Sequence, residues 1–184
     1  YGDQALVLLE SLAARKGFRL DDFAARWRSL FKSYRGYHDQ ATKTTLRNHE
    51  MAERPEDGGS SSQDLAGAAR IAPLVFRYQD DPDSLVEAAR AQTRMTHNNT
   101  VIVDCAEFLA RTAHRVLSGE TPVSAMTRVA EDRFVDSHIH EWVEEGIRSK
   151  EEESISTVAR FGQSCHAEEA FPGVVHLISR YEED

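Results

Sequence analysis

The chain of 184 residues contains 31 acidic and 22 basic residues, which give it a net charge of −9 at pH 7. This charge repels nucleic acid and anionic membrane surfaces, so neither is expected as a partner. The length and the hydrophobic content of 40% suit a single helical domain over residues 1–184, and no apolar run approaches the roughly 20 residues that span a bilayer.

Apolar residues recur at the helical period in nearly every segment, and strand-like alternation is not sustained. We therefore predict an all-α fold, a compact orthogonal array of about eight or nine helices of ordinary length. Because a domain rarely opens directly on a helix, the chain is expected to be a piece of a longer protein, incomplete at both ends. In chain order, the helices are predicted at about residues 1–16, 21–34, 39–52, 81–97, 101–117, 122–134, 139–147, 151–161 and 168–184.

The longest break in the helical pattern is the segment 54–63, which contains Pro55, Gly58, Gly59 and a run of three serines. Connections in helical domains usually have about 2 to 8 residues, so this segment is predicted to be a flexible loop, either functional or mobile. Small side chains dominate the following run, 65–74. They indicate a helix that packs closely against its neighbours or lies near a ligand.

Several residues suggest chemistry that their spacing does not support. His138 and His140 would point about 200° apart on a helix, so they are not expected to share a metal ion. Cys165 precedes His166, but adjacent residues seldom bring a nucleophile and its base together, and Cys165 is interpreted as a small buried side chain. With Cys105 as the only other cysteine, a disulfide framework is not expected and a cytoplasmic location is favoured. Paired acids at predicted helix starts are interpreted as partners of the helix dipole rather than as a glycosidase dyad: Asp21–Asp22, Asp80–Asp81 and Glu168–Glu169.

Three polar or glycine-bearing joints between the apolar helices are harder to explain by packing. They are the loop before Gly67, the joint Thr96–His97 and the segment 162–165. Loops on a rigid helical scaffold commonly carry ligand contacts, so these joints are expected to converge on one cleft.

Four segments occur in an order that is familiar: Gly2-Asp3-Gln4 before a helix, the run 70–74, Thr96–His97, and Gly162 followed by the run 169–172. This order, over nearly the whole chain, resembles the ADP-ribosylglycohydrolase family. The resemblance implies an all-α fold with two magnesium ions, which hold and activate a water that attacks the anomeric carbon of ADP-ribose. Magnesium suits such a role because it takes oxygen ligands and lowers the pKa of bound water.

The resemblance also implies the residues of the site. Asp3 falls where the family has a metal-binding Thr-Asp-Asp-Thr, so it is the expected magnesium ligand and catalytic residue, although Tyr1, Gly2 and Gln4 depart from that motif. The family's second ligand set, Asp-x-Asp-Thr after a Gly-Gly pair, is expected beyond Asp184. The resemblance also implies that residues at the joints contact the ligand: Gly67, His97, Gly162, Ser164 and Cys165. For His97, helix capping is the alternative role.

The implied function is a hydrolase that cleaves an N- or O-glycosidic bond to ADP-ribose or a related nucleoside. Its partner would be an ADP-ribose-like small molecule or an ADP-ribosylated substrate. Two alternatives stay open. One is a non-catalytic relative that binds a nucleotide or sugar beside a degenerate metal site. The other is a helical domain that docks a protein partner through its exposed loop and acidic surface.

Overall fold

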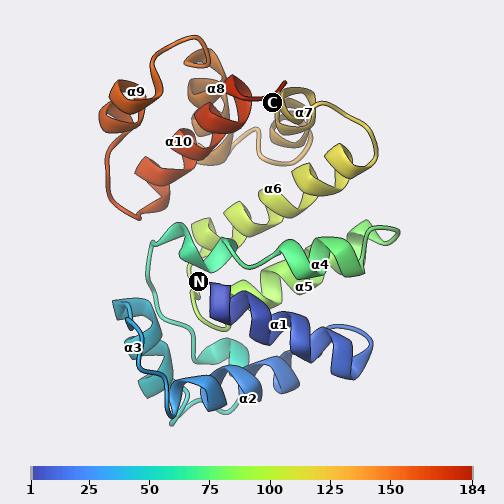
Figure 1. Cartoon of the computed structure of the whole chain (residues 1–184), viewed down its shortest axis with the longest axis vertical. Coiled ribbons are helices and arrows are strands. Elements are labelled where there is room, and N and C mark those ends of the chain that lie inside the picture. The colour runs from blue at the N-terminus through green and yellow to red at the C-terminus, as the bar shows by residue number, and fades with distance from the viewer. Residues whose placement is uncertain (1, 184) are drawn as a thin grey trace. The chain divides into compact units, whose positions relative to one another are not determined.

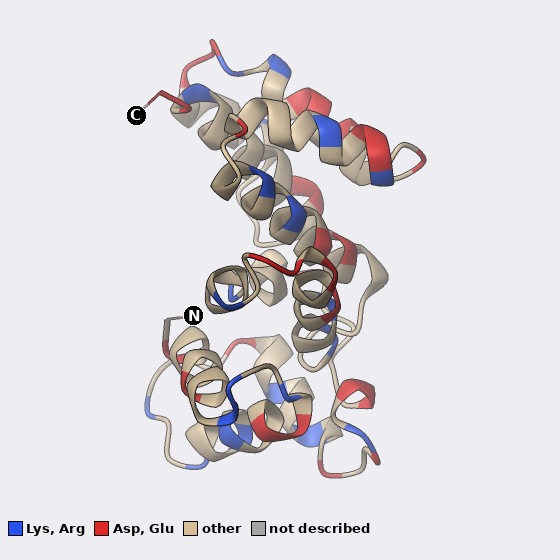
Figure 2. Ribbon diagram, turned by 90° about the vertical axis from the view of Figure 1, so that its right-hand side faces the viewer, with Lys and Arg blue, Asp and Glu red and all other residues tan. Residues whose placement is uncertain are grey.

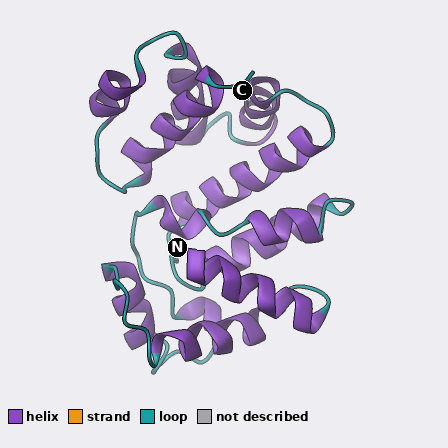
Figure 3. Ribbon diagram, viewed as in Figure 1, coloured by secondary structure: helices purple, strands orange, loops and turns teal. Residues whose placement is uncertain are grey.

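A computed structural model describes residues 2–183 and shows an all-α chain, as predicted (Figure 1, Figure 3). The one strand-like feature within these residues is an isolated bridge between Ser60 and His97. Tyr1 and Asp184, which the first and last predicted helices include, lie outside the described residues. The elements in the described part of the chain are α1 (Gly2–Arg15), α2 (Leu20–Phe31), α3 (Gln40–Asn48), the 3-10 turns η1 (Pro55–Asp57) and η2 (Leu65–Ala68), α4 (Ala72–Arg77), α5 (Pro82–Arg94), α6 (Thr100–Leu117), α7 (Pro122–Arg133), α8 (His138–Arg148), α9 (Ser154–Phe161) and α10 (Ala167–Arg180).

The chain divides into two compact units, Tyr1–Glu107 and Phe108–Asp184, with the boundary inside α6. A single-domain organisation over 1–184 stays a prediction. In the first unit, α1 packs against α2 and α4, and α5 packs against both α2 and α4 (Figure 1). The core of this unit is built from large buried side chains that recur at the helical period: Leu8, Leu12, Phe23, Trp27, Leu74, Leu85, Met95 and Ile102.

A polar cluster around Asp22 joins α1 to α2. The carboxylate accepts hydrogen bonds from Ser11 Oγ (2.7 Å), Arg15 Nε (2.8 Å) and Arg26 Nε (2.7 Å). The Asp22 side chain is 9% exposed, so these bonds are only partly screened by solvent. The donors, with Ser11 contributing most, lower the pKa of Asp22 to about 2.

Replacing Asp22 is expected to remove a pH-dependent part of the stability. Because the folded-state pKa lies below the ordinary value of 3.8, the cluster stabilises the fold above that pH and loses its effect as the pH falls toward about 2. We expect Asp22→Asn to lower the free energy of unfolding at neutral pH by at most about 2 kcal/mol. Urea unfolding across the acid range measures this effect, with Asp21→Asn at the exposed neighbouring carboxylate as the control. Equal pH dependence in wild type and Asp22→Asn would contradict the prediction.

The second unit is organised around α10, which packs against α7, α8 and α9. The ring of Phe108 meets Phe134 and Phe171 edge-on, with centroids 5.9 Å and 5.3 Å away. Gly146 on α8 lies directly against α10, because a Cβ at this position would be 2.6 Å from Val175 Cβ. Glycine therefore permits the close approach of these two helices.

Two predicted helices differ from the structure. The run 65–74 is not one helix: η2 ends at Ala68, and α4 starts at Ala72 with Pro73 in its first turn. Proline has no N–H to donate, so it suits a helix start and not a helix interior, and the separate α4 brings the described residues to ten α-helices. Helix α3 ends at Asn48 rather than near residue 52, and the next side chain, His49, turns inward so that Nε2 donates to Met95 O at 3.1 Å.

None of the helices in the described range is both long enough and apolar enough to cross a membrane. Figure 2 shows lysines and arginines interspersed with acidic residues along the chain.

Candidate functional site

Arg70 lies at the centre of a buried polar cluster in the first unit and is only 2% exposed. Its Nη1 donates to Gln4 Oε1 (2.7 Å), its Nε to Gln92 Oε1 (3.1 Å) and its Nη2 to Thr96 Oγ1 (2.6 Å). These acceptors are uncharged. The guanidinium is therefore held by dipoles from α1, α5 and the joint after α5.

The two glutamines reach Arg70 because they occupy positions on the apolar faces of their helices. Gln4 is one turn before Leu8 on α1, and Gln92 is one turn after Ala88 on α5; all four residues are buried. Gln4 Oε1 also accepts a hydrogen bond from Trp27 Nε1 at 2.8 Å. A buried amide has to be hydrogen-bonded, so these contacts fix the orientation of both glutamine side chains.

The predicted flexible loop is attached to the joint after α5 by backbone hydrogen bonds. Ser60 N donates to Thr96 O (3.0 Å), and Asn98 N donates to Ser60 O (2.7 Å). Thr45 Oγ1 donates to the same Thr96 carbonyl at 2.8 Å. This part of the loop therefore helps to position His97, whereas flexibility of the whole segment stays a prediction.

Gly67 and His97, two of the predicted ligand-binding residues, lie against each other. A Cβ on Gly67 would be 2.8 Å from His97 Cγ, so glycine leaves the space that the imidazole needs. His97 is 3% exposed, and its Nδ1 lies 2.9 Å from Thr96 Oγ1. Its Nε2 is buried without a hydrogen-bond partner in the described structure. One ring nitrogen is thus left for a further partner.

Burial is the main cause of the pKa shifts in this cluster. It lowers the pKa of Arg70 to about 10, with an opposing effect of Asp39, so the guanidinium stays charged at neutral pH. Burial, followed by the charge of Arg70, lowers the pKa of His97 to about 4 against the attraction of Asp39 and Asp64. His97 is therefore neutral at neutral pH, with one ring nitrogen as donor and the other as acceptor.

Asp3, the predicted magnesium ligand, is an exposed residue in the first turn of α1, directly before Gln4. Its Oδ2 accepts a hydrogen bond from the Tyr34 hydroxyl at 2.7 Å, which raises the pKa of Tyr34. Across residues 2–183, no group of three or more His, Cys, Asp or Glu side chains is placed to hold a metal ion. The described residues by themselves therefore do not fit a two-magnesium centre.

The other three predicted ligand-binding residues lie in the second unit, in the loop between α9 and α10. Gly162 has a φ of 123°, and a Cβ there would overlap the carboxylate of Glu169. Ser164 N donates to Glu169 Oε2 at 2.9 Å, and this bond is the main cause of a lowered Glu169 pKa. Glu169, in the first turn of α10, therefore holds the loop that carries Cys165. That this loop shares one cleft with His97 stays a prediction.

Cys165 is exposed, so its interpretation as a small buried side chain is wrong. The residue lies in the loop before α10 rather than on a helical face, and a loop of polar residues does not pack into a core. Its role as a ligand contact stays a prediction. His138 is an exposed residue whose Nδ1 lies 3.3 Å from Glu141 Oε2.

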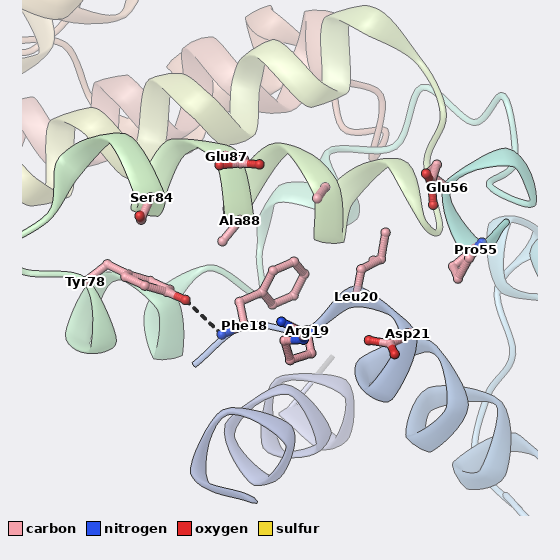
Figure 4. Close-up of a pocket in the computed structure, with 11 residues that line it drawn as sticks. Phe18, Arg19, Leu20, Asp21, Pro55, Glu56, Tyr78, Ser84, Glu87 and Ala88 are labelled. Carbon is pink, nitrogen blue, oxygen red and sulfur yellow. Dashed lines mark hydrogen bonds between the residues drawn. The ribbon is translucent and has the colours of Figure 1, made fainter. Parts of the chain in front are cut away.

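A cavity of about 540 Å³ lies elsewhere in the first unit (Figure 4). Figure 4 shows Phe18 among the residues that line it, with the backbone N of Phe18 donating to the Tyr78 hydroxyl at 2.8 Å. Acidic side chains, one arginine and two aromatic rings contribute to the lining: Phe18, Arg19, Leu20, Asp21, Pro55, Glu56, Tyr78, Ser84, Glu87, Ala88 and Ala91. The lining includes none of the predicted site residues, so this cavity does not support the predicted ligand site.

Comparison with known proteins identifies the family. A family model described as ADP-ribosylglycohydrolase matches residues 1–184. The chain belongs to the ADP-ribosylglycohydrolase family. A search of curated proteins gave no match. Membership confirms the resemblance seen in the sequence and the all-α fold class, and it suggests an activity of the ADP-ribosylglycohydrolase type. ADP-ribosylglycohydrolases act on ADP-ribosylated substrates and are generally metal-dependent.

Four polar residues of this ADP-ribosylglycohydrolase family member were not predicted to belong to the site: Gln4, Arg70, Gln92 and Glu169. The sequence contains a signal for three of them, because Gln4 and Gln92 interrupt apolar helix faces and Arg70 interrupts a run of small residues. A polar side chain at such a position indicates a buried hydrogen-bond network. Glu169 carries no comparable signal, since an acid in the first turn of a helix is ordinary.

Proposed function

We propose that this protein is an ADP-ribosylglycohydrolase that cleaves an N- or O-glycosidic bond to ADP-ribose or a related nucleoside, with water as the attacking group. The observation that carries the proposal is the contact between Gly67 and His97 beside the buried charge of Arg70, in a chain that matches the family over residues 1–184. A buried guanidinium raises the local positive potential, which favours a ligand that carries phosphates. The unpartnered Nε2 of His97 adds a polar contact for an oxygen of that ligand.

The proposed ligand contacts are Gly67 and His97 in the first unit and Gly162, Ser164 and Cys165 in the second. Asp3 is the proposed catalytic residue and magnesium ligand. Replacing it tests that role: Asp3→Asn should abolish the magnesium-dependent part of ADP-ribose release and leave the affinity for ADP-ribose without magnesium unchanged. Equal release by Asp3→Asn and wild type would contradict the role.

Replacing His97 is expected to weaken binding of ADP-ribose. His97→Asn places no donor at the Nε2 position and should weaken binding about tenfold, the effect of roughly one hydrogen bond. His97→Gln keeps a donor near that position and should lose less. Calorimetric titration of the full-length protein with ADP-ribose measures the affinity, and Glu87→Gln in the cavity of Figure 4 is the control.

Turnover is tested with an ADP-ribosylated protein substrate, by following the release of ADP-ribose with and without magnesium. The proposed function is wrong if the full-length protein neither binds ADP-ribose nor releases it. A second candidate function, a non-catalytic nucleotide- or sugar-binding relative, is favoured by the absence of a carboxylate cluster around Asp3 within residues 2–183. Binding of ADP-ribose without release would decide for this alternative.

A further inference from the structure

The hydroxyl of Thr96 connects the buried Arg70 to His97. Thr96 Oγ1 accepts a hydrogen bond from Arg70 Nη2 at 2.6 Å and lies 2.9 Å from His97 Nδ1. The other acceptor in reach of this hydroxyl, Thr93 O, is 3.5 Å away. A hydroxyl has one proton to donate, and the shorter contact favours His97 Nδ1 as its acceptor. Accepting a bond from a charged donor also polarises the hydroxyl and strengthens the bond that it donates.

The charge of Arg70 favours the same arrangement of protons. Nδ1 is the ring nitrogen that faces the Arg70–Thr96 hydrogen bond, so a lone pair on Nδ1 is attracted by the guanidinium, whereas an N–H would be repelled. The acidic groups that act on His97 are Asp39 and Asp64, and both favour protonation. The effects of burial and of the Arg70 charge on the pKa of His97 are larger than those of Asp39 and Asp64, so the ring is neutral at neutral pH. The remaining question is which of the two ring nitrogens carries the proton.

With a lone pair on Nδ1, the proton of the neutral ring sits on Nε2. Nε2–H is then a buried donor without an acceptor in the described structure. An unpaired buried donor costs free energy, and a ligand atom that accepts its hydrogen bond would remove that cost. We propose that Arg70 is a positioning residue that, through the Thr96 hydroxyl, holds His97 as the Nε2–H tautomer, ready to donate a hydrogen bond to a ligand oxygen. The ligand part rests on the proposed function, whereas the tautomer can be measured without any ligand.

The tautomer is measured by long-range ¹H–¹⁵N correlation NMR on the ligand-free, full-length protein labelled at its histidines. The chain has 8 histidines, and His97→Gln assigns the signals of interest by their loss. Thr96→Val removes the hydroxyl and keeps the branched shape, Thr96→Ala is a second hydroxyl-free variant, and Thr96→Ser keeps the hydroxyl. We expect only Nε2–H in wild type and Thr96→Ser, and a mixture with Nδ1–H in both hydroxyl-free variants. Arg70→Met should shift the ring toward Nδ1–H as well.

A purely structural role of Thr96 would leave the tautomer unchanged in these variants. Nδ1–H in the wild type, or Nε2–H alone in the hydroxyl-free variants, would therefore overturn the proposal. In titrations with ADP-ribose, Thr96→Val should bind about tenfold more weakly and Thr96→Ser as tightly as wild type. If the tautomers follow the expectation but the wild type does not bind ADP-ribose, the positioning role stands and the proposed function fails.

Discussion

Replacing Arg70 by methionine is expected to lower the free energy of unfolding by about 3 kcal/mol. Methionine matches much of the length of arginine but donates nothing, so the bonds to Gln4, Gln92 and Thr96 are lost. At about 2 kcal/mol for a bond from a charged donor, this loss costs about 6 kcal/mol. Removing the buried charge offsets about half of that cost, because burial lowers the pKa of Arg70 from 12.5 to about 10 and each pKa unit corresponds to about 1.4 kcal/mol. The free energy lost with the hydrogen bonds is therefore expected to exceed the free energy gained by removing the buried charge.

Urea unfolding at neutral pH measures the change as a lower midpoint with an unchanged slope. Arg94→Met is the matched control, because Arg94 is an exposed arginine on α5, two residues after Gln92. The control should change the free energy of unfolding by less than about 0.5 kcal/mol. A methionine variant as stable as wild type would mean that the cost of burying the charge cancels the hydrogen bonds.

Helical periodicity predicts most of the fold because it reports burial directly. The stripe on α2 is an example: Phe23, Trp27 and Phe31 recur one turn apart and are buried on one face. The same periodicity does not separate η2 from α4. Gly67, inside η2, has no side chain, and the alanines around it contribute little to any apolar stripe, so only Pro73 indicates a new helix start.

The site is harder to predict because its contacts join segments that are distant in the sequence. The sequence brought Gly67 and His97 together only through the general expectation that the polar and glycine-bearing joints converge on one cleft, since nothing local to either residue indicates the other. The partners of Arg70 come from α1, α5 and the joint after α5, and they meet only when these elements pack together. A polar residue on an apolar face predicts that a buried network exists, but it does not predict which residues complete the network.

Gly162→Ala is expected to lower the free energy of unfolding by about 3 kcal/mol, through two separable effects. The first is the backbone, because φ of 123° and ψ of 163° lie in a region that is essentially restricted to glycine. The second is the overlap of the new Cβ with the carboxylate of Glu169. Moving that carboxylate breaks its hydrogen bond from Ser164 N and releases the loop before α10.

The second unit offers a control for the backbone effect alone. Gly119 also has a positive φ, 97°, but a Cβ there would meet nothing within 4 Å. We expect Gly119→Ala, whose Cβ would meet no neighbouring atom, to cost only about 1 kcal/mol. Glu169→Ala removes the overlapping carboxylate, and the double variant with Gly162→Ala should therefore be less destabilised than the sum of the single variants. Equal costs for Gly162→Ala and Gly119→Ala, or strict additivity in the double variant, would show that Glu169 does not hold the loop.

Since Ser164 and Cys165 are proposed ligand contacts, Gly162→Ala should also weaken ADP-ribose binding while leaving the tautomer of His97 in the first unit unchanged.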